Sequence, residues 1–183
     1  MEIESTSLAG VVVLTPRRFG DDRGFFAETW NRHRLAEADI HVDFVQDNQA
    51  FSAQAGTFRG LHFQRPPHAQ AKLVRVGRGA IVDVVVDLRH ASPTYGRHVA
   101  VTLSAENRKQ IYVPVGFAHG YMTTEPDTEV LYKASDYYAP EAEGGLRFDD
   151  PALAIDWPLT GASVSANDRD RSWPLLGEQE TVF

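Results

Sequence analysis

Short runs of β-branched and aromatic residues recur along most of this 183-residue chain, and glycine or proline separates many of them. One short, charged segment at 31–38 has the pattern of a helix, and the region from Gly144 onward is rich in turn-forming residues. Many short strands with few helices between them favour an antiparallel sandwich or barrel, with the last part of the chain wrapped around it as short helices and loops. The runs predict strands at 11–14, 25–30, 44–46, 57–64, 72–76, 80–88, 98–103, 110–113 and 129–134.

The strand predicted at 80–88 is unusually apolar on both of its faces. Successive side chains of a strand point to opposite sides, so alternate residues share a face. One face carries only Ala, Val and Leu, and the other carries Ile81 and Val85 beside Asp83 and Asp87. We expect the second face to meet further structure, including a polar cavity. A strand buried on both sides is what a double-sheeted barrel provides.

Charge and composition exclude several classes of function. The chain carries 18 lysines and arginines against 25 aspartates and glutamates, a net charge of −7, which disfavours a nucleic-acid-binding protein. An anionic small molecule remains a suitable ligand if arginine and lysine gather locally. Because there is no cysteine, the chain has no disulfide, no thiolate nucleophile and no cysteine-ligated zinc.

Length and hydropathy point to one cytoplasmic domain. At 183 residues the chain is long enough for one full core, so we expect a single domain spanning 1–183. Its longest apolar runs, such as 11–14 and 84–86, are far too short to cross a bilayer. The acidic start, MEIEST, lacks the basic residues and the long apolar stretch of a signal peptide. We therefore expect a cytoplasmic protein with no membrane partner.

Side chains that can carry acid–base chemistry concentrate in four segments. An isolated histidine such as His62 more commonly makes a structural hydrogen bond, so a role as base requires a partner that orients its ring. Asp83 can be that partner if its strand lies beside the strand of His62. Tyr132 can equally be a core residue and Lys72 a solvated strand end, so residue types alone leave each role open. The segments are RGLHFQ at 59–64 followed by Lys72, the strand with Asp83, PVGFAHG at 114–120, and the stretch from Tyr132 to Glu143.

The histidines do not show the spacing of a metal site. Barrel enzymes that hold iron, zinc or manganese cluster two or three histidines, but here Gln64 stands two residues after His62. The other histidines are scattered at 33, 41, 68, 90, 98 and 119. Glycine-rich phosphate loops of the ATP- and NAD-binding types are also missing from the sequence. We therefore expect no metal and no other cofactor.

Nine stretches, taken in their order and spacing, carry a specific resemblance. They are FGDDRGFFAETW (19–30), FVQDN (44–48), FRGLHFQ (58–64), KLVRV (72–76), DVVVDLRHASPTYG (83–96), LSAEN (103–107), VPVGFAHG (113–120), LYKASDYYAP (131–140) and IDWP (155–158). Each stretch alone is a weak signal, and their combination is highly specific. On these residues the chain resembles the dTDP-4-dehydrorhamnose 3,5-epimerases over essentially its whole length.

The resemblance implies a mainly β fold, a jelly-roll barrel of the cupin type without metal and with short peripheral helices. It implies epimerisation at carbons 3 and 5 of dTDP-4-dehydro-6-deoxy-D-glucose by proton abstraction next to the 4-ketone. The product would be dTDP-4-dehydro-L-rhamnose, and the assembly a homodimer with sites shared between subunits. Close relatives that invert a single carbon, or isomerise the ketone of a dTDP-4-keto-6-deoxyhexose, share most of these motifs. Two further alternatives are a metal-dependent barrel oxygenase and a non-catalytic nucleotide-sugar-binding module.

The resemblance also assigns roles to individual residues. It makes His62 the base, Asp83 the carboxylate paired with it, and Tyr132 the acid on the opposite face of the sugar. Lys72 becomes the cation beside the 4-keto oxygen. Arg23 and Glu28 are expected in the site of the neighbouring subunit. The substrate-binding positions are Arg23, Phe26, Glu28, Gln46, Asp47, Asn48, Arg59, Lys72, His119, Tyr138, Glu143 and Arg169.

Two details of this assignment depend on local geometry. The family has a Ser-x-Lys/Arg-Asp pattern before a proline near its end, and VSANDRDRSWPLL can be aligned with it in two ways. Counting back from Pro174 selects Arg169 and Asp170, whereas counting forward from Ser165 selects 167–168; we prefer Arg169 because a cation is needed there. Arg59 and His62 have opposite parity on a regular strand. Both reach one cavity only if Gly60 marks a bulge or Arg59 sits at the rim.

Overall fold

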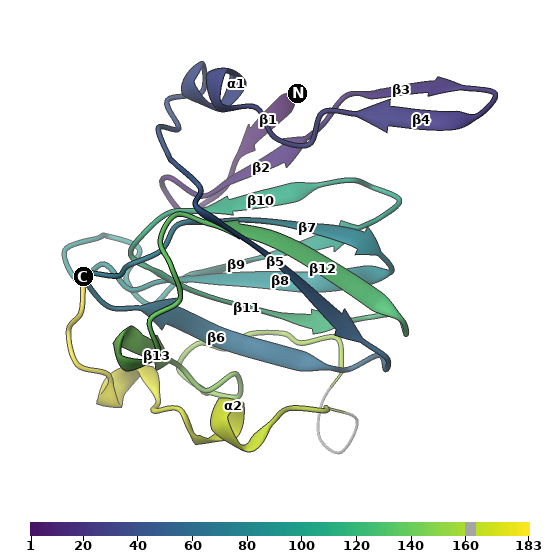
Figure 1. The fold of residues 1–183 in the computed structure, drawn as a ribbon. Helices are drawn as coiled ribbons and strands as arrows, with labels where there is room; N and C mark the ends of the chain where they lie inside the picture. The colour runs from purple at the N-terminus through teal and green to yellow at the C-terminus, as the bar shows by residue number, and fades with distance from the viewer. Residues whose placement is uncertain (160–163) are drawn as a thin grey trace.

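The structure of the protein, a computed structural model, describes residues 1–159 and 164–183 and is built mainly from two antiparallel sheets (Figure 1). The first contains, from edge to edge, β1 (Glu2–Ser5), β2 (Val12–Thr15), β10 (Gln110–Val113), β7 (Lys72–Arg78), β12 (Thr128–Ala134) and β5 (Gln46–Ser52). The second contains β13 (Glu143–Gly145), β6 (Phe58–Gln64), β11 (Phe117–Thr123), β8 (Ala80–Asp87) and β9 (His98–Ser104). The predicted mainly β, double-sheeted fold is confirmed.

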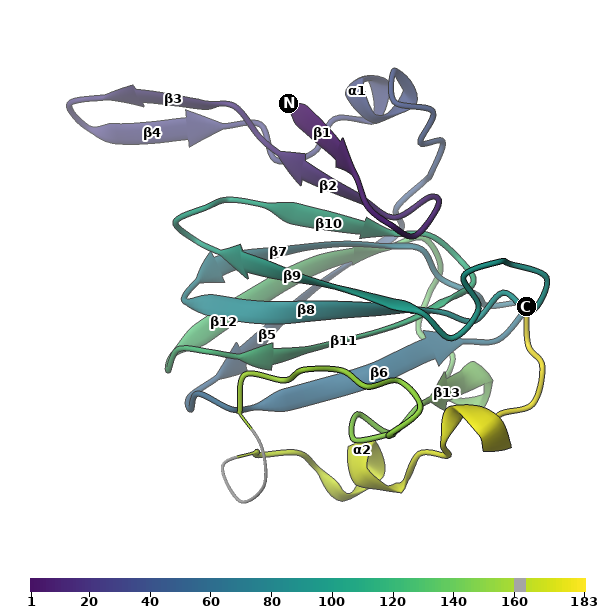
Figure 2. The same ribbon diagram turned by 180° about the vertical axis from the view of Figure 1, so that it is seen from behind.

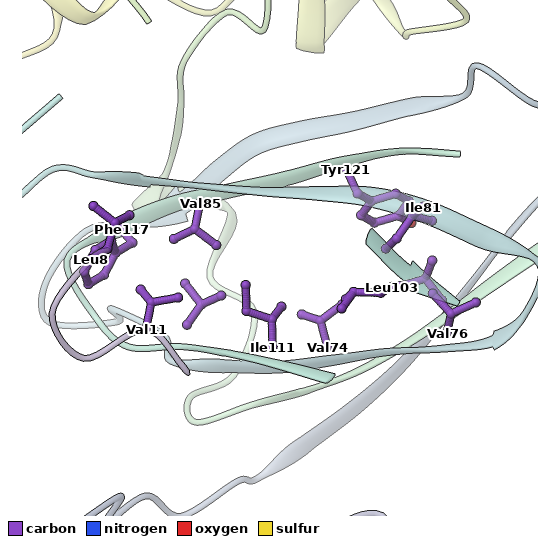
Figure 3. Close-up of a cluster of buried hydrophobic side chains, with 12 residues drawn as sticks. Leu8, Val11, Val74, Val76, Ile81, Val85, Leu103, Ile111, Phe117 and Tyr121 are labelled. Atoms are coloured by element: carbon purple, nitrogen blue, oxygen red, sulfur yellow. The ribbon is translucent and has the colours of Figure 1, made fainter. Parts of the chain in front are cut away.

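The two sheets face each other across an apolar core (Figure 3). Ile81 and Val85 of β8 point into this core, where they meet residues such as Val74 of β7. Val84 and Val86 of the same strand belong to a second apolar cluster on the other side of their sheet. The strand is therefore buried on both faces, as its sequence predicts.

The chain after β13 covers the outer face of the second sheet (Figure 2). Leu153, Trp157 and Val164 from this region pack with Phe58 of β6 in the second apolar cluster. Its regular elements are short, namely α2 (Asp168–Ser172) and η3 (Leu176–Glu178), and a further short turn, η1 (Pro140–Ala142), precedes β13. The predicted wrapping of the barrel by short helices and loops is confirmed.

Two strands that shape the site escape prediction from the sequence. Every residue of β11 is buried, but FAHGYMT lacks the alternation of apolar and polar residues and Gly120 reads as a turn residue. For β5 the apolar pattern predicts a strand only at 44–46, whereas the observed strand runs on through the polar sequence QDNQAFS. Its inward side chains line a polar cleft rather than an apolar core, so the usual signal for a strand is missing.

A hairpin of β3 (Arg18–Asp21) and β4 (Gly24–Ala27) projects beyond both sheets (Figures 1 and 2). It takes the place of the strand predicted at 25–30, and its Phe26 side chain is among the most exposed aromatics. After it comes α1 (Arg32–Ala36), shorter than the predicted 31–38, with the Asn31 side chain capping its first turn. Within the described residues, no helix has the length and apolar character needed to cross a membrane.

Candidate active site

Two cavities of about 340 Å³ and 190 Å³ are lined by residues of both sheets. His62, Lys72 and Tyr132 line both cavities, so the two hollows form one cleft. This arrangement brings the predicted base, acid and cation around one space. The predicted site residues that line the cleft are Gln46, Asn48, Arg59, His62, Lys72, His119, Tyr132, Tyr138 and Glu143.

A bulge in β6 explains how Arg59 and His62 reach the same cavity. On the neighbouring strand β11, Tyr121 lies opposite Arg59 and His119 lies opposite His62, so β6 holds one more residue than its partner over this interval. Gly60 has a φ of +140°, and a Cβ placed there would lie 2.5 Å from the Cα of Gly120. Only glycine fits such a close approach of two backbones. A bulge at Gly60, one of the two alternatives that the sequence leaves open, is present in the structure.

His62 is held by an aspartate of the tail. Its Nε2 lies 2.7 Å from Oδ1 of Asp170, which is buried. The side chain of Asn167 caps α2 by accepting the backbone N–H of Asp170 at 2.7 Å, and Trp173 stands edge-on to the His62 ring at 6.1 Å. A neutral imidazole that donates from Nε2 keeps its lone pair on Nδ1. Asp170 therefore leaves Nδ1 as the nitrogen that can accept a proton.

The predicted pairing of His62 with Asp83 is wrong. Strand β11 lies between β6 and β8, so His62 and Asp83 are not on adjacent strands. Asp83 Oδ2 instead accepts a hydrogen bond from Nε2 of His119 at 2.8 Å, and both residues are buried. The cleft thus contains two separate His–Asp pairs, one at its wall with the tail and one within the second sheet.

Lys72 and Tyr132 face His62 from the opposite sheet. They lie on the adjacent strands β7 and β12, with Lys72 opposite Ala134 and Tyr132 opposite Val74. Burial lowers the pKa of Lys72 to about 8, and the charge of Asp83 opposes this fall. Burial also raises the pKa of Tyr132, so this phenol keeps its proton at neutral pH. One wall therefore offers a proton acceptor and the other an ammonium and a phenol.

A network of polar side chains lines the larger cavity on the side of β5 and β13. Gln46 donates to the Oδ1 of Asn48 at 2.9 Å and accepts the backbone N–H of Tyr138 at 3.1 Å. The Tyr138 hydroxyl donates to Oε2 of Glu143 at 2.8 Å, and the guanidinium of Arg169 pairs with the same carboxylate. Arg169 therefore places a positive charge beside this cavity.

Arg171 serves the tail instead. Its guanidinium donates to the backbone carbonyls of Val164 at 2.9 Å and Ala166 at 3.3 Å and lies over the ring of Phe148. Of the two arginines of α2, only Arg169 contacts a residue that lines the cleft. This contact favours the alignment of the tail that starts from Pro174.

Four predicted binding residues lie outside the cleft of their own chain. Arg23 pairs with Asp21 in the projecting hairpin, Phe26 is 69% exposed there, and Glu28 pairs with Arg34 at 2.8 Å. Asp47 points to the outer face of its sheet, where it pairs with Lys133 at 2.6 Å. No group of three or more histidine, aspartate or glutamate side chains in 1–159 and 164–183 is placed to hold a metal ion.

Sequence reasoning missed several residues that shape the cleft. Asp170 stands next to Arg169 in the aligned tail pattern, and that position was the available signal for it. Tyr121 lines the smaller cavity beside His119, but it becomes visible only once β11 is known to be a strand. Gln70 also lines the cleft and has no sequence signal of its own. Asn167 lines it too, at a position that the other alignment of the tail selects.

Comparison with known proteins agrees with this geometry over the full length. A family model described as dTDP-4-dehydrorhamnose 3,5-epimerase matches residues 5–178. The enzyme of that name from Sinorhizobium fredii is 48% identical over 183 residues, which are 100% of this chain and 93% of that one. The crystal structure of the Bacillus anthracis enzyme with TDP and PPi bound has a TM-score of 0.92 at 47% identity, covering 95% of this chain and 98% of that one.

A second solved structure, the enzyme from Legionella pneumophila in complex with dTDP-4-keto-L-rhamnose, has a TM-score of 0.93 at 42% identity and covers 98% of this chain and 94% of that one. Sequence and fold thus agree from one end of the chain to the other. The chain belongs to the dTDP-4-dehydrorhamnose 3,5-epimerase family.

Proposed function

We propose that this protein is an isomerase that inverts carbons 3 and 5 of dTDP-4-dehydro-6-deoxy-D-glucose, giving dTDP-4-dehydro-L-rhamnose. One observation carries the proposal. A histidine oriented by a buried aspartate faces a lysine and a tyrosine of the opposite sheet across a single cleft. The family of the chain and its full-length similarity to the Sinorhizobium enzyme support the same reaction.

His62 removes the proton. A carbon acid beside a ketone is weak, so a neutral imidazole needs help from stabilisation of the enolate that forms. Nδ1 of His62 takes the proton while Asp170 stabilises the resulting imidazolium through Nε2. Lys72 donates to the 4-oxygen, where the negative charge develops. At neutral pH its ammonium form predominates, because its pKa is about 8.

Tyr132 returns a proton to the other face of the sugar. Inversion needs a donor opposite the base, and Tyr132 belongs to the opposite sheet from His62. Burial raises the pKa of Tyr132, which keeps the phenol protonated until the enolate collapses. The same two side chains act at carbon 3 and at carbon 5. Between the two events His62 releases its proton to solvent and Tyr132 regains a proton from solvent.

Arginine and histidine side chains bind the diphosphate. The chain is acidic overall, with a net charge of −7, so the anionic substrate depends on local cations. Arg59 and His119 line the smaller cavity, and Arg169 pairs with Glu143 of the larger one. A diphosphate would compete with the Glu143 carboxylate for the Arg169 guanidinium.

A second copy of the chain completes the site. The hairpin of β3 and β4 projects away from its own barrel (Figure 1). It carries Arg23 and Phe26, and both side chains are exposed. In a homodimer these residues, together with Glu28, would enter the neighbouring cleft and contact the nucleotide, with Tyr138 as a second aromatic. Such an exchange of hairpins explains why aromatic side chains stand exposed on a projecting arm.

Proton NMR of the substrate with the protein in deuterium oxide tests the proposed reaction. We expect deuterium at both carbon 3 and carbon 5 and a product with inverted configuration at both. Deuterium at one carbon alone would establish a single-position epimerase, and movement of the carbonyl a ketoisomerase. If wild-type protein exchanges no deuterium into the sugar, the chain is a nucleotide-sugar-binding module and not an enzyme. His62→Ala protein is the control for uncatalysed exchange.

A further inference from the structure

Two aspartates of β8 are fully buried, but their carboxylates differ in the hydrogen bonds that they accept. Asp87 accepts hydrogen bonds from the side chains of Arg89, Ser92 and Thr94 at 2.6–2.9 Å. Asp83 is 0% exposed, and within the described residues its Oδ1 has no hydrogen-bond partner, while Oδ2 accepts one bond from His119. A buried carboxylate left with an unbonded oxygen is costly unless a nearby positive charge compensates it.

The side chain of Lys72 is directed to the same region between the sheets. Asp83 shares its face of β8 with Ile81 and Val85, and this face points into the core. Lys72 shares its face of β7 with Val74, which lies in that core. The two side chains therefore approach one another from opposite sheets, and the charge of Asp83 raises the pKa of Lys72 against the effect of burial.

We propose that Asp83 is a positioning residue that acts as counter-ion of Lys72 and orients His119, while Asp170 alone serves the base. Asp83 has no place in proton abstraction, since β11 separates it from His62. Its charge keeps the Lys72 ammonium protonated in a buried site, ready to donate to the 4-oxygen. The inference rests on the proposed role of Lys72 in the epimerase reaction.

Other charged groups also surround Lys72, and the test must separate their effects. They are His62 and Arg59 of β6, His119 and Tyr121 of β11, Tyr132 of β12, Tyr138, Glu143 of β13 and Asp170 of α2. Each of the three carboxylates has a partner, since Asp83 pairs with His119, Glu143 with Arg169 and Asp170 with His62. Asp83 differs because, of these three, it alone has a buried oxygen without a hydrogen-bond partner among the described residues. Removal of the Asp83 charge should therefore act on Lys72 without changing the base.

The pH dependence of kcat/KM distinguishes the two roles, because it reports the ionisations of the free enzyme. Activity is lost at alkaline pH when Lys72 loses its proton, and at acidic pH when His62 gains one. In Asp83→Asn the ammonium loses its counter-ion, so the alkaline limb moves to lower pH, by about one unit or more. The acidic limb stays in place. In Asp170→Asn the opposite pattern is expected, with a changed acidic limb and an unmoved alkaline limb.

Asp87→Asn is the matched control, since it removes a buried charge from the same strand. It should lower the thermal stability and leave both limbs in place, because Asp87 bonds to the 89–94 loop and lines neither cavity. If Asp83→Asn does not fold, Asp83→Val removes the same charge and places an apolar, β-branched side chain between Ile81 and Val85.

A downward shift of the alkaline limb in either folded variant supports the inference, and titration of the Lys72 Nζ by NMR should follow the same shift. An unmoved alkaline limb, or a shift of the acidic limb, would overturn it. Failure of the proposed function looks different, because wild-type protein would then exchange no deuterium into the sugar at any pH.

Discussion

Oδ1 of Asp170 accepts a hydrogen bond from Nε2 of His62 at 2.7 Å, although the two residues are 108 positions apart in the chain. The base is therefore assembled from a barrel strand and from a short helix of the tail, which packs against the outer face of the second sheet. An intact barrel with a displaced tail would hold a histidine without its orienting partner.

Asp170→Asn should lower kcat by roughly 10²–10⁴-fold. An asparagine amide can donate to Nε2 and so place the His62 proton on Nδ1, which removes the lone pair from the substrate side. Steady-state kinetics measure the loss, and calorimetric titration with dTDP should give a Kd near that of the wild type. His62→Ala sets the lower limit of activity, and an Asp170→Asn variant within a few-fold of the wild type would remove the pair from the mechanism.

Tyr132→Phe should separate proton exchange from inversion. His62 can still remove a proton and return one to its own face, so deuterium enters at carbon 3 or 5 with the configuration largely kept. Net epimerisation falls sharply, and the melting temperature changes little because the ring is retained. NMR in deuterium oxide follows both quantities in one sample. If the variant epimerises at the wild-type rate, the donor is another group, and Tyr138 is the next residue to test.

Arg169→Ala should weaken the binding of dTDP, whereas Arg171→Ala should lower the thermal stability. Loss of a charged hydrogen bond of about 1.5–3 kcal/mol corresponds to a roughly 10–100-fold weaker Kd for dTDP in Arg169→Ala. Arg171→Ala should leave this Kd within about twofold and lower the melting temperature, because its bonds to Val164 and Ala166 hold the tail. Calorimetry and thermal unfolding of both variants are the measurements, and equal losses of affinity would contradict the assignment.

Gly60→Ala should destabilise the fold and reduce activity together. The added Cβ would meet the Cα of Gly120 at 2.5 Å, and the φ of +140° disfavours any side chain. We expect the free energy of unfolding to fall by about 1–3 kcal/mol. Chemical denaturation measures this change. Gly177→Ala is a suitable control, because nothing lies within 4 Å of a Cβ placed there. Equal stability of the two variants would show that the backbones of β6 and β11 can separate without cost.

The sequence predicts the architecture well because the strands of the core carry a strong apolar pattern. The run at 80–88 predicts β8 and its burial on both faces. A bulge at Gly60 is one of two alternatives that the sequence offers for bringing Arg59 and His62 to one cavity, and the structure contains it. The parity conflict between Arg59 and His62 could be recognised before the structure was known, because a strand repeats every two residues.

Partners in space are harder to predict than residues with reactive side chains. Asp83 is a natural partner for His62 only as long as β11 is missing from the predicted sheet. In the structure β11 lies between their strands, and Asp83 accepts a hydrogen bond from His119 of β11 instead. Asp170 lies in a region with no strand pattern, where docking of the tail rather than local sequence decides the contact.

Helix α2 carries Arg169 and Asp170 at consecutive positions, one beside the larger cavity and the other on the base. A diphosphate bound to Arg169 would therefore also fix the position of the Asp170 carboxylate, which orients His62. Binding energy from the diphosphate, which does not react, would then help to lower the barrier at the reacting carbon, because Arg169 and Asp170 are adjacent. A free 4-keto sugar without its nucleotide should be a slow substrate even when it saturates the cleft, with a deficit in kcat as well as in KM.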